Sequence, residues 1–178
     1  MPRTAILAVA ALLCLIPAAW ANHIPGQPCS NCASHKYWPT IDGKIKKAGS
    51  HSVTYVGTAR SDELLGHHGS DVLRGLGRSD VLWGDHDPNG QPASQRDRIY
   101  GGGGRDFIYG SHGHNRLFGG AGNDAISAHY GRGFIDCGPG RDIYHVPISL
   151  KKAYRVVNCE KVDRRSESDR GGGLKPLP

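Results

Sequence analysis

The sequence predicts an all-β fold: a right-handed parallel β-roll, a type of β-solenoid, built from nine-residue half-coils with short N- and C-terminal caps. The chain has 26 glycines among 178 residues but only three Phe and one Met, too little bulky apolar material for a broad core. The glycines show no Gly-X-Y period, which excludes collagen. A nine-residue unit repeats through the centre with Asp and Leu or Ile at fixed offsets. A narrow, turn-rich coil accommodates all three observations.

Residues 1–21 are predicted to be a secretory signal peptide. Arg3 supplies the positive charge, residues 5–16 form the apolar run, and Ala19-Trp20-Ala21 resembles a cleavage site. The apolar run is too short for a membrane span, although an uncleaved anchor is the alternative. We therefore expect a secreted mature chain that begins near Asn22 and has no membrane span.

Four cysteines remain after this segment: Cys29, Cys32, Cys137 and Cys159. An even number in an exported chain suggests two disulfides, and proximity in sequence favours Cys29–Cys32 and Cys137–Cys159 among the three possible pairings. The Cys29-x-x-Cys32 pair is alternatively half of a zinc site or a redox pair, but neither a second CxxC nor a βαβ pattern accompanies it. Residues 22–56 are interpreted as an N-terminal cap or linker that carries this CxxC.

Residues 57–145 divide into nine units of nine residues, the fourth of them lengthened by an insertion around residues 87–95. The sixth position reads Asp62, Asp71, Asp80, Asp97, Asp106, Asn115, Asp124, Gly133 and Asp142. The eighth position reads Leu64, Leu73, Leu82, Ile99, Ile108, Leu117, Ile126, Ile135 and Tyr144. The last three residues of each unit predict a short strand whose eighth-position side chain points inward, so the core is one Leu or Ile wide.

The units resemble the RTX, or hemolysin-type, calcium-binding nonapeptide, whose consensus is G-G-x-G-x-D-x-U-x with U a large apolar residue. Gly101–Tyr109 and Gly119–Ser127 match it nearly fully. The resemblance implies that each Ca²⁺ sits between turns two units apart, held by their Asp carboxylates and loop carbonyls. Stacked carboxylates would repel one another without a cation, and oxygen ligands favour the hard ion Ca²⁺. The alternative is that each Asp only caps its turn by hydrogen-bonding the backbone.

Odd and even units lie on opposite sides of such a roll. The odd side keeps its aspartates throughout: Asp62, Asp80, Asp106, Asp124 and Asp142. We expect the best calcium pairs to be Asp106 with Asp124 and Asp124 with Asp142, then Asp80 with Asp106. Asp62 with Asp80 is weaker because units one and three lack the full glycine set. The even side has Asp71 and Asp97, and its later units have Asn115 and Gly133 at the same position. The turn glycines expected at calcium are Gly101, Gly102, Gly104, Gly119, Gly120, Gly122, Gly138 and Gly140.

Histidines gather in the even-unit turns: His67, His68, His86, His112, His114 and His129. His68, His86 and His112 recur at coil spacing near Asp85 and Asp87, which suggests a site for Zn²⁺, Cu²⁺ or Ni²⁺. A pH-sensitive face is a second interpretation. A third is that exposed turns simply tolerate polar residues.

The net charge of +6 is unevenly distributed. Residues 57–145 are slightly acidic, and the excess of basic residues lies in the segments before and after them. The basic clusters are small and lack an aromatic platform, so no nucleic-acid partner is expected. Residues 146–163 are expected to form a C-terminal capping strand, clipped by Cys137–Cys159, and residues 164–178 a disordered tail. This ending is similar to that of many short exported bacterial proteins of the RTX family.

No G-x-S-x-G, H-E-x-x-H or P-loop pattern occurs, so an enzyme is not expected. Residues 22–56 are too few for the separate catalytic domain that active family members carry. The N-terminal signal also differs from the secretion tail of RTX toxins. The sequence predicts a secreted calcium-binding roll that folds outside the cell, where Ca²⁺ is abundant. The alternatives are a module that binds polysaccharide or the cell envelope through Trp83, Tyr100 and Tyr109 or a face of the roll, and a transition-metal binder.

Overall fold

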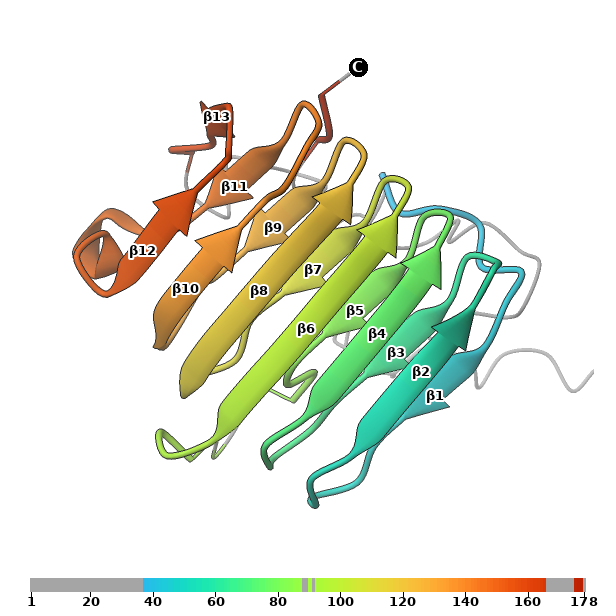
Figure 1. Cartoon of the computed structure of the whole chain (residues 1–178). Coiled ribbons are helices and arrows are strands. Elements are labelled where there is room, and N and C mark those ends of the chain that lie inside the picture. Colours follow the sequence, from blue (N-terminus) through green and yellow to red (C-terminus); the bar gives the residue numbers. More distant parts are fainter. Residues whose placement is uncertain (1–36, 88–89, 91, 166–174, 178) are drawn as a thin grey trace, which may run out of the picture.

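The chain winds as a parallel β-solenoid in the computed structural model, which describes residues 37–87, 90, 92–165 and 175–177 (Figure 1). One sheet has seven strands in the order β1-β3-β5-β7-β9-β11-β13, and the other has six in the order β12-β10-β8-β6-β4-β2. The predicted all-β roll is therefore confirmed. The predicted signal peptide, the Cys29–Cys32 pair and residues 166–174 and 178 of the tail lie outside the described residues.

The strands follow the repeat. The seven-stranded sheet contains β1 (Ile45–Lys47), β3 (Glu63–Leu65), β5 (Val81–Trp83), β7 (Phe107–Tyr109), β9 (Ala125–Ser127), β11 (Ile143–His145) and β13 (Lys161–Val162). The six-stranded sheet contains β2 (Thr54–Thr58), β4 (Val72–Gly77), β6 (Arg96–Gly103), β8 (His114–Ala121), β10 (Arg132–Asp136) and β12 (Tyr154–Val157). Odd units thus end in one sheet and even units in the other, so two units complete one coil.

The lengthened fourth unit does not disturb the register. Ile108 pairs with Ile126 one coil further on, and Leu82 pairs with Ile108 in the same way across the insertion. The extra residues lie in the turn between β5 and β6, where they lengthen a loop without shifting the strands.

The core between the sheets is a single column from each sheet, as expected. Eight eighth-position side chains are fully buried at 0% exposure: Leu64, Leu73, Leu82, Ile99, Ile108, Leu117, Ile126 and Ile135. Burial of each contributes roughly 1.5–3 kcal/mol relative to exposure. The repeated column explains how so few aromatic residues suffice.

The outer face of the seven-stranded sheet is covered by other parts of the chain. Val81, Phe107, Tyr109, Ala125 and Ile143 form a second apolar cluster there with Ile41, against which Trp38 and Leu177 pack. Trp38 Nε1 donates a hydrogen bond to the Tyr109 hydroxyl at 2.7 Å. Leu177 belongs to the segment predicted to be a tail. The outer face of the six-stranded sheet has no such cover among the described residues.

Regular structure extends past the nonapeptides at both ends. The strand β1 and most of β2 precede Gly57, and β12 and β13 follow a short 3₁₀ helix, η2 (Ile148–Leu150). The Cys137–Cys159 disulfide ties this last segment to the coil before it. Within the described part of the chain, no helix has the length and apolar character required to cross a membrane.

Candidate calcium sites

A ladder of hydrogen bonds joins the aspartates of the odd units, whose turns precede β3, β5, β7, β9 and β11 and form what we call the odd edge. The backbone N–H of each aspartate donates to Oδ1 of the aspartate one coil further on. The distances are 2.7 Å for Asp62 to Asp80, 2.8 Å for Asp80 to Asp106, 2.8 Å for Asp106 to Asp124 and 2.7 Å for Asp124 to Asp142. All five side chains are buried. One oxygen of each carboxylate from Asp80 to Asp142 is thus occupied by the neighbouring coil.

Both ends of the ladder have a residue that the sequence interpretation missed. Lys44 N–H donates to Asp62 Oδ1, and Asp142 N–H donates to Glu160 Oε2 at 2.6 Å. Lys44 and Glu160 stand one coil before Asp62 and one coil after Asp142. Continuing the coil spacing beyond the nonapeptides would have identified them.

The turns are of two kinds, which differ in whether the second carboxylate oxygen of the aspartate, Oδ2, has a hydrogen-bond partner. In turns 75–80, 101–106, 119–124 and 137–142, which we call open turns, Oδ2 of the aspartate is buried and has no hydrogen-bond partner. The aspartates are Asp80, Asp106, Asp124 and Asp142. An unpaired buried carboxylate oxygen is unfavourable, and its repetition along one edge marks a place for a cation.

In the other turns, which we call closed, this oxygen is satisfied by the protein. Thr58 N–H donates to Asp62 Oδ2 at 2.6 Å, and His67 N–H donates to Asp71 Oδ2 at 3.1 Å. On the even edge, formed by the turns before β4, β6, β8 and β10, Asp97 Oδ2 accepts the Ser111 hydroxyl. Asp62 and Asp71 therefore have the turn-capping arrangement that the sequence left open as the alternative, whereas Asp97 is satisfied by a side chain of the next coil.

The backbone of the second turn residue separates the open turns from the two turns that are closed by their own amide, those of Asp62 and Asp71. It is left-handed in every open turn: φ is 86° at Leu76, 116° at Gly102, 107° at Gly120 and 92° at Gly138. This conformation directs the amide away from the turn's own carboxylate, so that Gly120 N–H instead donates to the Cys137 carbonyl at 3.0 Å. Unit three was expected to be weaker for lack of glycine, yet Leu76 adopts the open conformation.

Three of the four open turns begin with a glycine, which leaves room for oxygen atoms from two coils; the fourth begins with Cys137. Asp106 Oδ2 and the Gly119 carbonyl both lie where a Cβ on Gly101 would stand. The same arrangement recurs at Gly75, with Asp80 Oδ2 and the Gly101 carbonyl, and at Gly119, with Asp124 Oδ2 and the Cys137 carbonyl. These cradles contain only oxygen donors, as Ca²⁺ requires.

The remaining predicted glycines are needed for the close approach of successive coils. A Cβ on any of them would overlap a carbonyl oxygen of the preceding coil: Gly102, Gly104, Gly120, Gly122, Gly138 and Gly140. The structure thus places every predicted calcium glycine in the walls of the open turns.

Burial shifts the ionisation of the ladder. Desolvation raises the pKa of Asp106 to about 8, with the neighbouring carboxylates Asp124 and Asp80 adding to the shift. Desolvation likewise raises the pKa of Asp80 and Asp124 to about 7 and of Asp142 to about 6. On the even edge, burial raises the pKa of Asp97 to about 7. Ionised carboxylates in these turns therefore need a compensating positive charge.

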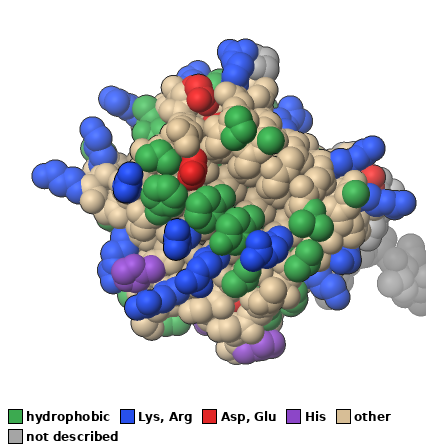
Figure 2. All heavy atoms as spheres, in the orientation of Figure 1, with side chains coloured by type: hydrophobic (Ala, Val, Ile, Leu, Met, Phe, Trp, Pro, Cys, Tyr) green, Lys and Arg blue, Asp and Glu red, His purple; other side chains and the backbone are tan. Residues whose placement is uncertain are grey.

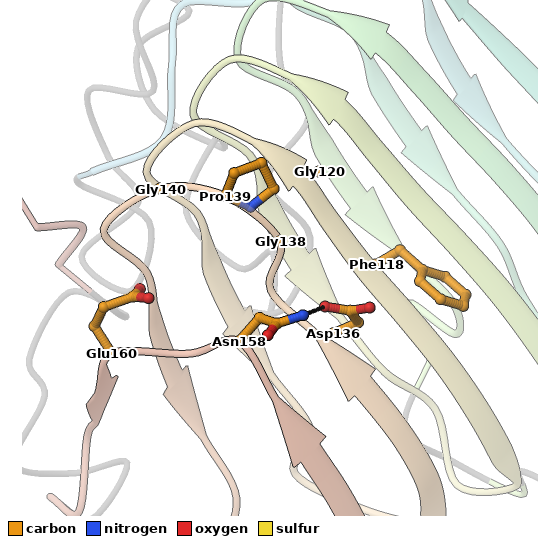
Figure 3. A pocket seen from close by; sticks show the side chains of 8 residues that line it. All are labelled: Phe118, Gly120, Asp136, Gly138, Pro139, Gly140, Asn158 and Glu160. Atoms are coloured by element: carbon orange, nitrogen blue, oxygen red, sulfur yellow. Dashed lines mark hydrogen bonds between the residues drawn. The ribbon is translucent and has the colours of Figure 1, made fainter.

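A shallow groove of about 540 Å³ lies beside the last open turn (Figure 3). Gly138, Pro139 and Gly140 of that turn line it together with Glu160. Asn158 Nδ2 donates to Asp136 Oδ1 at 2.8 Å across its floor. The C-terminal end of the odd edge is consequently open to solvent, with the Glu160 carboxylate in the wall.

The three histidines predicted as a metal site do not form one cluster. His112 stacks on Tyr130 with ring centroids 4.0 Å apart, and the ring of His86 bonds the Gly66 carbonyl through Nδ1. His68 lies instead beside His67 and Asp85.

Comparison with known protein families matches residues 54–87 and 94–126 to the RTX calcium-binding nonapeptide repeat, in four copies. These segments are RTX repeats. RTX repeats bind Ca²⁺ and are not themselves enzymatic, so calcium is the cofactor of this array. The match ends at residue 126, but the open turn 137–142 continues the RTX geometry beyond it. Searches of curated proteins and of solved structures found no match.

Proposed function

We propose that this protein is a secreted calcium-binding roll whose folding is driven by Ca²⁺ held at the open turns. The observation that supports this function best is the row of four buried carboxylate oxygens without a partner, confined to the open turns. Burying an ionised carboxylate without a partner costs several kcal/mol. A divalent cation bound at each of the four open turns would offset that cost.

The proposed ligands are the unpaired oxygens of the open turns together with carbonyls of the next coil. They come from Asp80, Asp106, Asp124 and Asp142, with the carbonyls of Gly101, Gly119 and Cys137. Glu160 stands where the next aspartate would be. Asp62, Asp71 and Asp97 are not among the proposed ligands, because their oxygens are already hydrogen-bonded.

Calcium titration calorimetry on two matched variants tests this assignment. Asp124→Asn places an amide in an open turn, and we expect one fewer Ca²⁺ bound or an affinity at least tenfold lower. Asp97→Asn is the control, because Asn115 already occupies the next even turn and its carbonyl oxygen accepts the Ser111 amide at 2.9 Å. Its calcium affinity should stay within about threefold of the parent. Equal losses in both variants, or none in Asp124→Asn, would contradict the assignment.

Secretion is the second part of the proposal. It is supported by the predicted signal peptide and by the abundance of calcium outside cells, which suits sites of roughly 10⁻⁴–10⁻³ M affinity. Mass spectrometry of protein recovered from the culture medium should give a chain that begins near Asn22. Recovery only from the cell interior, with residues 1–21 retained, would contradict secretion.

A second candidate function is binding of an anionic polysaccharide, favoured by the outer face of the six-stranded sheet, which no described residue covers. Strand register brings six exposed arginines onto this face, which we call the arginine face: Arg74, Arg96, Arg98, Arg116, Arg132 and Arg155. Its described strands present one carboxylate, that of Asp136, which is hydrogen-bonded to Asn158. Figure 2 shows the resulting band of basic side chains beside an apolar strip.

The apolar strip is aromatic. Tyr100 and Phe118 stack with ring centroids 4.9 Å apart, and the Arg74 guanidinium lies 4.6 Å from the Tyr100 centroid. Guanidinium groups bind carboxylates and sulfates through paired hydrogen bonds, while aromatic rings pack against sugars. Of the aromatics predicted for such a role, Tyr100 is on this face, whereas Trp83 and Tyr109 lie on the other sheet, beneath Trp38.

Binding to immobilised alginate, with neutral dextran and duplex DNA as comparisons, tests this second candidate. We expect salt-sensitive alginate binding that falls at least fivefold in Arg98→Gln/Arg116→Gln. Arg105→Gln, on the odd edge, should bind like the parent. Equal binding to dextran, preferential binding to DNA, or no alginate binding by the calcium-loaded parent would overturn it.

A further inference from the structure

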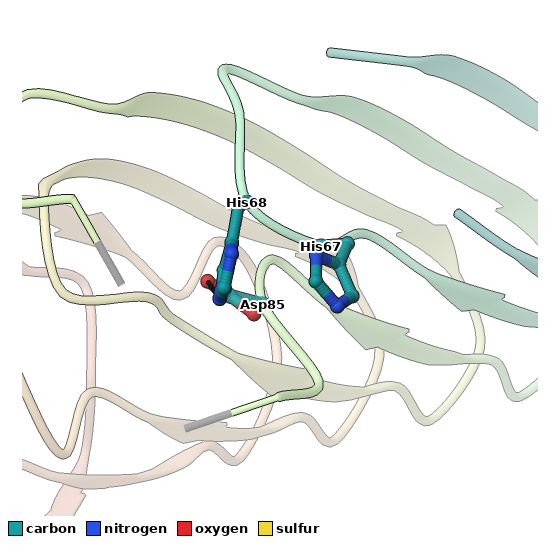
Figure 4. A group of neighbouring side chains, drawn as sticks. All are labelled: His67, His68 and Asp85. Atoms are coloured by element: carbon teal, nitrogen blue, oxygen red, sulfur yellow. Dashed lines mark ion pairs between the residues drawn. The ribbon is translucent and has the colours of Figure 1, made fainter. Parts of the chain in front are cut away.

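Two histidines and one aspartate meet on the even edge, away from the calcium ladder. His67 and His68 are consecutive in the turn between β3 and β4, and Asp85 lies in the turn one coil further on. Each of the three offers a ligand atom within 4.8 Å of the others. Figure 4 shows both rings on the same turn, with the Asp85 carboxylate beside the His68 ring.

One nitrogen of each imidazole is buried without a hydrogen bond, although the two side chains remain 17% and 24% exposed. His67 Nδ1 and His68 Nε2 are both buried and accept or donate no hydrogen bond. His68 Nε2 lies 3.9 Å from Asp85 Oδ2, and His67 Nε2 lies 3.8 Å from Asp87 Oδ2, distances too long for hydrogen bonds. The unpaired nitrogen atoms and the buried Asp85 carboxylate are therefore separated by a space into which a cation fits.

The surrounding hydrogen bonds fix the three side chains in place. Asp85 is only 2% exposed, and its Oδ1 accepts the Asp87 amide at 3.0 Å. Gln95 Nε2 lies 3.4 Å from Asp85 Oδ2, while Gln95 Oε1 accepts the Gly69 amide at 3.3 Å. Gln95 therefore connects the carboxylate of one coil to the histidine turn of the other. Such outer partners orient metal ligands.

We propose that His67, His68 and Asp85 form a binding site for a borderline divalent transition-metal ion, represented by Zn²⁺. Two imidazole nitrogens and one carboxylate oxygen suit Zn²⁺, whereas Ca²⁺ prefers an all-oxygen site. Ligand bonds of about 2.0–2.1 Å place tetrahedral ligand atoms roughly 3.3 Å apart, so modest side-chain rotations close the site. Asp87, beside His67, or a water molecule completes the coordination.

This site is independent of the calcium sites in position and chemistry. The histidine turn is closed, since the His67 amide already satisfies Asp71. Zinc binding therefore does not compete with the open turns. The insertion in the fourth repeat, which breaks the calcium pattern on this edge, supplies Gln95 to the histidine site.

Calorimetric titration of the full chain with Zn²⁺ in saturating Ca²⁺ tests the proposal. Cys29 and Cys32 are changed to serine throughout, so that they contribute no zinc affinity. We expect one Zn²⁺ per chain with a dissociation constant of about 10 µM or lower. Asp85→Asn and His68→Ala should each weaken binding at least tenfold, and His129→Ala, on the even turn two coils beyond Asp85, should not change it.

Circular dichroism in Ca²⁺ verifies that each variant is folded, and Co²⁺ gives an independent readout. Visible absorption bands typical of four-coordinate Co²⁺ should form in the parent and be lost in His68→Ala. No zinc binding by the folded parent, or unchanged affinity in both Asp85→Asn and His68→Ala, would overturn the proposal. If His68→Ala does not fold, the conservative Asp85→Asn variant decides.

Discussion

At the scale of single residues, the backbone of the second turn residue distinguishes an aspartate that caps its turn from one that is left open. With ordinary φ at Thr58 or His67, the amide of that residue donates to the carboxylate four residues on. With left-handed φ at Gly102 or Gly120, the amide turns away and the same carboxylate keeps a buried, unpaired oxygen. In these turns one dihedral angle thus distinguishes a self-capped carboxylate from one with an unpaired oxygen.

Gly120→Ala should therefore damage the array. The new Cβ would overlap the Gly102 carbonyl and would sit on a residue with φ of 107°. We expect a loss of at least about 2 kcal/mol in unfolding free energy, from the left-handed backbone and the overlap together. Urea unfolding in Ca²⁺ measures it. Gly77→Ala is the control, because a Cβ there has no neighbour within 4 Å, and equal losses in both variants would contradict the account.

Leu76→Gly should stabilise the first open turn. Leu76 carries a left-handed φ of 86° that costs a non-glycine residue roughly 1–2 kcal/mol. Its side chain is 52% exposed and so loses little packing. After the greater entropy of glycine in the unfolded chain is subtracted, we expect a gain of about 0.5–1 kcal/mol in Ca²⁺. Thermal unfolding tests this, and a clear loss of stability would show that the leucine side chain matters.

The raised carboxyl pKa values predict how stability depends on pH. Burial lifts the pKa of Asp106 to about 8 and of Asp80 and Asp124 to about 7, whereas these groups titrate near 3.9 in the unfolded chain. Between about pH 4 and pH 8 the calcium-free roll therefore binds more protons than the unfolded chain, so its stability falls as pH rises.

Calcium reverses this trend, because Ca²⁺ binds the ionised carboxylates. We predict that, without Ca²⁺, more β structure survives at about pH 5 than at about pH 8, and that saturating Ca²⁺ stabilises most at the higher pH. Urea unfolding monitored by circular dichroism at both pH values measures this. Calcium-free stability that increases with pH would contradict the assignment.

At the scale of elements, each coil is too small to be stable alone. Strands such as β5, β7 and β9 have three residues each, and they gain their hydrogen bonds and their core contacts from the neighbouring coils. Stability therefore depends on the joints between coils and on how the ends are held. At the C-terminal end the holding element is the Cys137–Cys159 disulfide, at a sequence separation of 22.

Replacing both of these cysteines with alanine should destabilise the C-terminal end of the roll more than its middle. For a loop of this length the chain-entropy model gives a loss of roughly 3 kcal/mol. Hydrogen exchange in Ca²⁺ should show lost protection in β12 and β13 and little change in β6 and β7. Uniform loss along the roll would instead show that the bond stabilises the whole array.

At the scale of the whole molecule, the roll separates its chemistry among two edges and two faces. The odd edge carries the open calcium turns and the even edge the histidine cluster, while one sheet is covered and the other carries the arginine face. The slightly acidic balance of residues 57–145 hides this separation, because their acids lie mostly in the turns and many of their arginines on one sheet. Calcium bound at the turns would leave the molecule strongly basic on one face.

The repeat alone predicted the coil, the odd and even sheets and the buried column, because each depends on spacing and hydrophobic pattern. The sequence did not reveal which aspartates are open. Unit three lacks the second and fourth glycines of the consensus, yet Leu76 and Arg78 both adopt a left-handed φ and the turn is open. The proximity of His67, His68 and Asp85 was also not predicted, because Asp85 stands in the lengthened fourth unit, where the nine-residue spacing does not fix positions.

The most direct test of the central claim is far-ultraviolet circular dichroism of the full chain near pH 7.5, first in EGTA and then through a Ca²⁺ titration. We expect little β signal in EGTA and a cooperative gain with a midpoint of roughly 10⁻⁴–10⁻³ M Ca²⁺. Mg²⁺, which holds its own water shell more tightly, should not replace it. The same β spectrum in EGTA and in Ca²⁺ would contradict the claim that calcium drives folding of the roll.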